Sequence, residues 1–264
     1  MSTENVPLEQ LLVAQQAEAP SSAIGVFTLP CGYLDPATNE LHSDVMMREI
    51  TGYEEDMLAS DVIPNNAKMD ALLSACVQRV GTITDPGKIS QVVKEMTVGD
   101  RSFLIFALRR VTLGNEFPMR VTCTNPRCRK DSVFVVDLST LDIIPMKNPQ
   151  KRVYDVKTPS GRDVRFKVST GIDQHRVNKL VSKDKQDAMS LLMLMRVELV
   201  DGKAPALADF KQLGLRDRQF LRKSFLEVEG GVDTSIVFEC KSCGHEWKGE
   251  LDVNTNGFFS PSVV

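Results

Sequence analysis

Two short pairs of cysteines impose the strongest constraint on the fold of this chain. Cys123 and Cys128 enclose a four-residue turn, whereas Cys240 and Cys243 enclose a two-residue turn. Strand-like runs flank each turn on both sides, which predicts two β-hairpins with a pair of thiols at each tip. Tetrahedral zinc needs four ligands at about 2.3 Å from one ion, and neither pair alone supplies them. The four cysteines together predict one structural Zn²⁺ per chain, bound between the two hairpins.

Other interpretations of the cysteines stay open at this point. Six cysteines, including the isolated Cys31 and Cys76, could form disulfides, although a chain of 264 residues does not need such support. The paired cysteines could be reduced and free of metal, or the site could have lost zinc and become oxidised. His245 could replace a cysteine ligand, but four thiolates already complete the shell, so we expect it beside the site or at the surface.

The second half of the sequence repeats features of the first half. The segment Gly99-Asp-Arg-Ser-Phe-Leu104 aligns with Arg216-Asp-Arg-Gln-Phe-Leu221 at an offset of 117 residues, and the same offset carries Cys123 to Cys240. Apolar residues in both segments recur at the spacing of one helix face. We therefore predict matching helices over residues 100–113 and 217–229.

The similarity continues upstream with a small change of offset. Leu29-Pro-Cys-Gly32 aligns with Thr158-Pro-Ser-Gly161, and Thr51-Gly52 aligns with Thr170-Gly171. The sequence therefore predicts an α+β fold of two pseudo-repeated halves, each a hairpin followed by helices, joined by a shared Cys₄ site that resembles a zinc ribbon.

This interpretation divides the chain into five segments. They are an extended N-terminal arm (1–22), a first half with the Cys123/Cys128 turn (23–138), a linker (139–152), a second half with the Cys240/Cys243 turn (153–253) and a C-terminal tail (254–264).

Within the halves, local patterns predict individual helices. Thr51 and Glu54 have the spacing of a capping box, which marks the start of a helix. Apolar residues at helical spacing predict one helix over residues 66–80 and another over residues 183–200.

Composition and motifs argue against three classes of function. The net charge of −3 gives the chain no overall basic field for nucleic acid. The longest apolar runs fall far short of the ~20 residues that span a membrane, and we expect no signal peptide. The sequence has no phosphate-binding glycine loop, no zinc-protease helix and no nucleophile elbow. We therefore expect a non-enzymatic protein without a membrane anchor.

Both ends of the chain are polar but include a few apolar residues. Leu8, Leu11 and Leu12 lie in the N-terminal arm, and Phe258 and Phe259 lie in the C-terminal tail. Neither end can build much core alone, so we expect these residues to bind neighbouring subunits as apolar anchors. The alternative is that the two phenylalanines fold back onto the surface of their own chain.

The order of these features resembles the bacteriophage baseplate proteins grouped with the baseplate-hub subunit of T-even phages. The resemblance covers residues 23–255. It rests on Glu49-Ile-Thr-Gly-Tyr-Glu-Glu-Asp-Met-Leu58, on Gly99-Asp-Arg-Ser-Phe-Leu-Ile-Phe-Ala-Leu-Arg109 and on the two cysteine hairpins.

This resemblance implies a structural subunit of a phage tail baseplate, in the hub or tail-tip region. It implies binding to other tail proteins, several copies in a symmetric assembly, and a place in the virion after assembly in the host cytoplasm. Two alternatives stay open: a tail assembly factor absent from the mature virion, and a zinc-ribbon regulator that binds nucleic acid. The near-neutral charge argues against the regulator.

Overall fold

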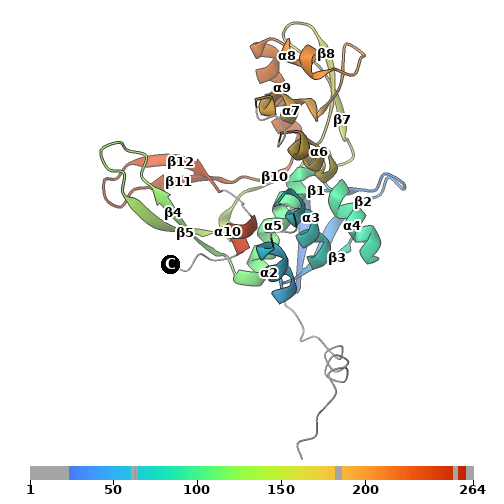
Figure 1. Cartoon of the computed structure of the whole chain (residues 1–264). Helices are drawn as coiled ribbons and strands as arrows, with labels where there is room; N and C mark the ends of the chain where they lie inside the picture. The colour runs from blue at the N-terminus through green and yellow to red at the C-terminus, as the bar shows by residue number, and fades with distance from the viewer. Residues whose placement is uncertain (1–23, 61–62, 64, 182–185, 252–254, 260–264) are drawn as a thin grey trace, which may run out of the picture.

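The computed structural model describes residues 24–60, 63, 65–181, 186–251 and 255–259. Figure 1 shows two units, each with a three-stranded sheet and helices, and an arm of long hairpins beside them. The sheets are antiparallel and the helices are grouped on them, so the predicted α+β class is confirmed.

The first unit is built around one buried helix. Its sheet has the order β1-β2-β3, and its longest helix packs on β1. Every side chain from residue 103 to residue 108 of that helix is buried. The elements are β1 (Ile24–Leu34), β2 (Leu41–Arg48), α2 (Gly52–Ala59), α3 (Asn65–Cys76), β3 (Val77–Val80), α4 (Pro86–Glu95) and α5 (Val98–Leu113).

The second unit has a separate cluster of buried side chains. Phe166 from its sheet packs against Phe225 from its longest helix, with ring centroids 4.9 Å apart, and Leu221 joins them in the core. The elements are β7 (Val153–Lys157), β8 (Asp163–Lys167), α6 (Gly171–Val181), α7 (Ala188–Leu194), β9 (Val197–Val200), α8 (Leu207–Lys211) and α9 (Leu215–Val228).

The two units contain the same kinds of element in the same order. Each has a hairpin, two helices, a third strand and two further helices. In each sheet the third strand pairs with the second, and an irregularity interrupts this pairing at Met46/Met47 in the first unit and at Arg165/Phe166 in the second.

A buried aspartate links the long helix to the hairpin in both units. Asp100, in the first turn of α5, accepts a hydrogen bond from the backbone N–H of Cys31 at 2.8 Å. Asp217, in the first turn of α9, accepts one from the backbone N–H of Ser160 at 3.0 Å. Both carboxylates satisfy a backbone donor outside the regular pairing, since Cys31 lies where the register of β1 shifts and Ser160 lies in the turn between β7 and β8.

The helix after each hairpin also begins in the same way. The predicted capping box at α2 is confirmed, and the backbone N–H of Thr51 donates to Glu54 at 2.9 Å. Glu54 pairs with Arg48 at 2.8 Å, and Asp173 in α6 pairs with Lys167 at 2.7 Å.

Two predicted helices are too long, for the same physical reason. The helix predicted over 66–80 ends at residue 76, and residues 77–80 form β3. The helix predicted over 183–200 contains α7, and residues 197–200 form β9. A strand of four residues that buries its two end residues continues the apolar spacing of a preceding helix, so periodicity alone misassigns it.

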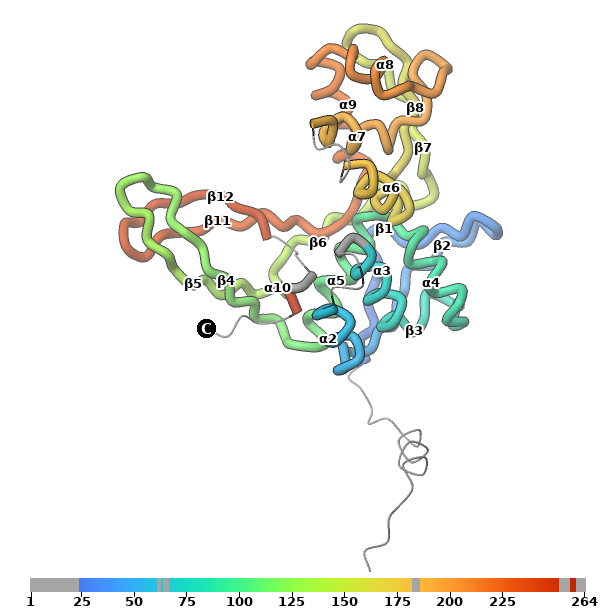
Figure 2. Tube along the Cα trace, in the orientation of Figure 1, coloured from blue at the N-terminus to red at the C-terminus, as the bar shows by residue number. Residues whose placement is uncertain are grey.

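The arm combines two hairpins that are distant in sequence. Each hairpin forms its own two-stranded sheet, and the two lie side by side away from the units (Figures 1 and 2). After the arm, α10 (Thr255–Phe259) contacts α2, α3 and α5. The arm elements are β4 (Glu116–Thr122), β5 (Asp131–Asp137), β11 (Ser235–Glu239) and β12 (Glu246–Glu250), with η1 (Leu138–Thr140), β6 (Ile143–Ile144) and β10 (Gly231–Val232) near the base.

Candidate metal centre

Each cysteine pair lies in a tight turn at the tip of a hairpin. The N–H of Cys123 donates to the carbonyl of Lys130 at 2.9 Å, and the N–H of Cys240 donates to the carbonyl of His245 at 2.9 Å. Gly244 has a φ of 67°, a left-handed conformation that glycine adopts readily. The turns therefore direct two thiols from each hairpin toward the other hairpin.

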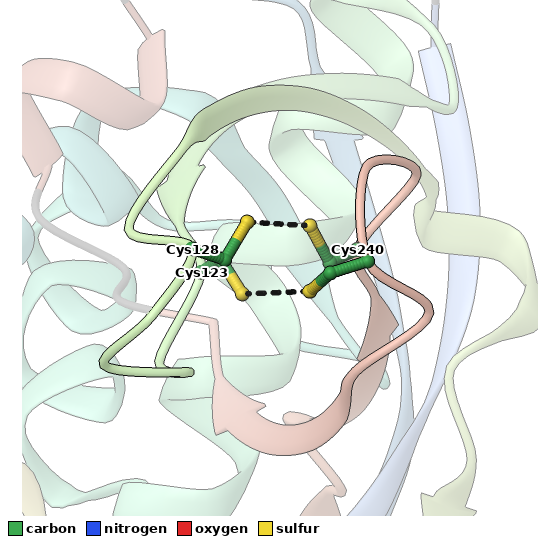
Figure 3. A group of neighbouring side chains, drawn as sticks. Cys123, Cys128 and Cys240 are labelled. Atoms are coloured by element: carbon green, nitrogen blue, oxygen red, sulfur yellow. Dashed lines mark hydrogen bonds between the residues drawn. The ribbon is translucent and has the colours of Figure 1, made fainter.

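The four sulfur atoms lie within 4.8 Å of one another. The Sγ atoms of Cys123 and Cys243 are 3.8 Å apart, as are those of Cys128 and Cys240 (Figure 3). A tetrahedron of thiolates at about 2.3 Å from one ion has sulfur–sulfur distances of about 3.8 Å. A disulfide would need about 2.05 Å, so the observed spacing is that of ligands that share a metal.

The electrostatic environment differs between the cysteines of the cluster. Backbone N–H groups of the turn, first that of Ser242, lower the pKa of Cys240 to about 7. Burial raises the pKa of Cys123 to about 12. Four adjacent thiolates repel one another, so all four can be ionised together only around a positive ion. The predicted set of four cysteines is thus brought together and could hold one metal ion.

Aromatic side chains form a second contact between the hairpins. Phe134 of β5 lies 5.1 Å from Phe238 of β11 and 6.2 Å from Trp247 of β12, measured between ring centroids. Phe238 and Trp247 stack at 5.6 Å. These rings lie on the inner faces of two-stranded sheets, which are marginally stable alone, so the hairpins depend on each other.

His245 lies beside the cluster, as expected. Its Nε2 atom is 3.0 Å from the hydroxyl of Thr124, and its ring stacks on Trp247 at 5.9 Å. The contact joins the two cysteine turns directly. Thr124 was not predicted, and only its place next to Cys123 could have pointed to it.

The two isolated cysteines are core residues. Cys31 is 2% exposed and Cys76 is fully buried, and burial raises the pKa of each to about 12. Neither belongs to the metal-binding group found in the described part of the chain.

The C-terminal phenylalanines are buried against their own chain, as the alternative interpretation expected, and their binding to neighbouring subunits stays a prediction. Phe258 is 1% exposed, and its ring lies 5.3 Å from Phe106 and 5.1 Å from Phe117. Arg109 donates to the carbonyl of Phe258 at 2.6 Å. Phe259 is 9% exposed. Burial of two large apolar rings explains why this end folds back.

The other predicted anchors, Leu8, Leu11 and Leu12, lie outside the described residues. Among the helices that the structure describes, none has the length and apolar character needed to cross a membrane.

Comparison with known proteins gives one match. The family model described as T4 bacteriophage base plate protein matches residues 36–259, which include the second unit, the arm, all four clustered cysteines and the first unit apart from β1. Neither the curated proteins nor the solved structures gave a significant match.

Proposed function

The chain belongs to the T4 bacteriophage base plate protein family, and from this premise we propose that it is a non-enzymatic structural subunit of the hub or tail-tip region. Membership implies a component of the virion tail that associates with other tail proteins. In our proposal it assembles in the host cytoplasm in several copies, and one structural Zn²⁺ stabilises it.

The spacing of the four cysteine sulfurs is the observation that carries the zinc proposal. Soft thiolate ligands in a four-coordinate arrangement are typical of structural zinc. Cys123, Cys128, Cys240 and Cys243 would fill all four positions and leave none open for a substrate or water. Such a closed site cross-links a protein and has no position for catalysis, which agrees with a structural role.

The zinc would stabilise a contact between segments that are far apart in the chain. Cys128 and Cys240 are separated by 112 positions, and each hairpin is a separate two-stranded sheet. Structural zinc contributes about 10 kcal/mol or more at neutral pH. The ion would therefore keep the arm rigid, as suits a surface that neighbouring subunits bind.

We further propose that the two halves arose by internal duplication. The shared element order, the two aspartates that accept from hairpin backbones and the two ion pairs at the starts of α2 and α6 support this. We retain the boundaries 23–138 and 153–253 for the halves, with residues 139–152 as the linker.

The N-terminal arm is the proposed connector to neighbouring tail proteins, through Leu8, Leu11 and Leu12. Phe258 and Phe259 could act as anchors only if α10 left its site on the first unit. Because α10 is docked on the first unit, the N-terminal arm is the better candidate for the connector.

Two measurements test the proposal. Elemental analysis of freshly purified protein should find about one equivalent of zinc, and four natively alkylated cysteines without metal would contradict it. Mass spectrometry of purified particles should detect the chain in the virion. A chain required for assembly yet absent from particles would favour the assembly factor, whereas salt-dependent DNA binding would favour the nucleic-acid regulator.

A further inference from the structure

A short backbone contact joins the two units of one chain. The N–H of Val98, at the start of α5, donates to the carbonyl of Ser169 at 2.9 Å. The N–H of Gly171, at the start of α6, donates to the carbonyl of Met96 at 3.0 Å. The residues between these partners form an isolated antiparallel β-bridge. The start of the long helix in one unit thus docks on the start of the first helix in the other.

The linker adds a second contact at the same junction. Arg152 donates to the carbonyl of Gly32 at 2.6 Å, and the N–H of Met146 donates to the carbonyl of Pro30 at 2.8 Å. The residues that lead into the second unit therefore lie on the hairpin of the first unit.

The corresponding surfaces at the two far ends of the molecule are exposed. Leu215 in the second unit corresponds to the half-buried Val98 and is 67% exposed. Tyr53 in the first unit corresponds to Ile172 and is 87% exposed. Figure 1 shows α2 and α8, the helix that precedes Leu215, at opposite ends of the stacked units, with the arm projecting sideways. Both ends are therefore open to another molecule.

Two corresponding glycines differ in their surroundings. A Cβ atom at Gly171 would lie 2.7 Å from the guanidinium carbon of Arg101, so that side chain would have to shift. Gly52 corresponds to Gly171, but a Cβ atom at position 52 would meet nothing within 4 Å. Arg218 corresponds to Arg101 in the second unit. The Arg218 side chain of another copy would crowd Gly52 as Arg101 crowds Gly171.

We propose that a second copy of this chain docks head to tail and repeats the contact between the two units. The N–H of Leu215 in one copy would donate to the carbonyl of Ile50 in the next, and the N–H of Gly52 would donate to the carbonyl of Leu213. This inference rests on the internal duplication proposed above and goes beyond the baseplate role. Such a heterologous contact closes into a ring if the rotation permits, and otherwise forms an open chain.

Sedimentation velocity on the full-length protein tests the docking contact. The wild type, measured from about 1 µM to about 1 mM, should associate as its concentration rises, because this range covers binding free energies down to about −4 kcal/mol. Leu215→Asp and Gly52→Gln should each weaken association at least about tenfold. Gly87→Gln, at an exposed glycine in the first turn of α4, is the matched control and should associate like the wild type.

Mixing the two variants separates head-to-tail docking from other association. The Leu215→Asp copy retains an intact α2 end and the Gly52→Gln copy retains an intact α9 end, so a mixture should form one-to-one dimers and nothing larger. A wild type that stays monomeric up to about 1 mM, variants that associate normally, or a mixture that stays monomeric would each overturn the contact. A monomeric protein that still contains zinc and enters particles would overturn this inference alone and leave the proposed function standing.

Discussion

Replacing Cys240 by serine should open the arm and leave both units folded. The change removes one of four sulfur ligands from the cluster, and the remaining three cannot complete a tetrahedral site. Because the two hairpins form separate sheets, they would then be held together mainly by the contacts of Phe134 with Phe238 and Trp247 behind the cysteines.

The magnitude follows from these contacts. Two aromatic pairs join the hairpins, Phe134 with Phe238 and Phe134 with Trp247, and they contribute roughly 0.5–1.5 kcal/mol each beyond area burial, or about 1–3 kcal/mol together. Structural zinc contributes about 10 kcal/mol or more, so the metal supplies most of the free energy that keeps the arm closed. By contrast, Cys31→Ser places a hydroxyl in a buried site of the first unit, which should lower the global free energy of unfolding by about 1–3 kcal/mol.

Hydrogen exchange distinguishes the two variants. In Cys240→Ser, amides of β4, β5, β11 and β12 should exchange at least about 1000-fold faster, while α5 and α9 stay protected. A loss of only about 4 kcal/mol of the free energy that zinc supplies already corresponds to about three powers of ten in the exchange rate. In Cys31→Ser, the amides of the two cysteine hairpins should keep their protection from exchange relative to the amides of the rest of the chain. If Cys240→Ser retains one equivalent of metal and a protected arm, the proposed role of the cluster is refuted.

Three further predictions concern the core and the ends. Phe258→Ala should lower the free energy of unfolding by about 3–5 kcal/mol, measured by denaturant titration, because the ring is 1% exposed; a change below 1 kcal/mol would contradict its burial. Hydrogen bonding from Arg48 lowers the pKa of Glu54 to about 2. The pair should therefore stabilise the fold fully above pH 4.5, the ordinary pKa of a glutamate, and this contribution should be lost as the pH falls toward 2. When the free energy of unfolding is measured against pH, Glu54→Gln should lack this pH-dependent contribution. A profile like that of the wild type would refute the prediction. Deletion of residues 1–20 should leave a folded, zinc-loaded protein that enters particles poorly. A normal yield in a particle assay would exclude the N-terminal arm as the connector to neighbouring tail proteins.

The cysteine cluster could be predicted from sequence because its chemistry is local. Each short turn contains its own pair of cysteines, Cys123 with Cys128 and Cys240 with Cys243. Because two thiols cannot complete a four-coordinate site, each pair predicts that a second pair lies beside it. The element order was equally accessible wherever a cap or a hairpin turn marked a boundary, as at Thr51.

The features that the sequence did not reveal depend on distant contacts. β3 and β9 are four residues long, and only their pairing with a hairpin strand distinguishes them from the end of a helix. The burial of Phe258 depends on Phe106, Phe117 and Arg109, the last of which is 149 positions away. A polar tail has no local signal for such a partner, so its composition favoured an exposed end.

The burial of α10 in the first unit has a consequence for synthesis on the ribosome. A ribosome adds about 5–20 residues per second, so Cys128 emerges roughly 6–22 s before Cys240, from which 112 positions separate it. Phe258 emerges later still, and until then the nascent first unit lacks the ring that packs on Phe106. The N-terminal unit is therefore completed last, by residues from the opposite end of the chain. A chain that ends before Cys243 can complete neither the cysteine cluster nor this core, and a chain that ends between Cys243 and Phe258 can complete only the cluster.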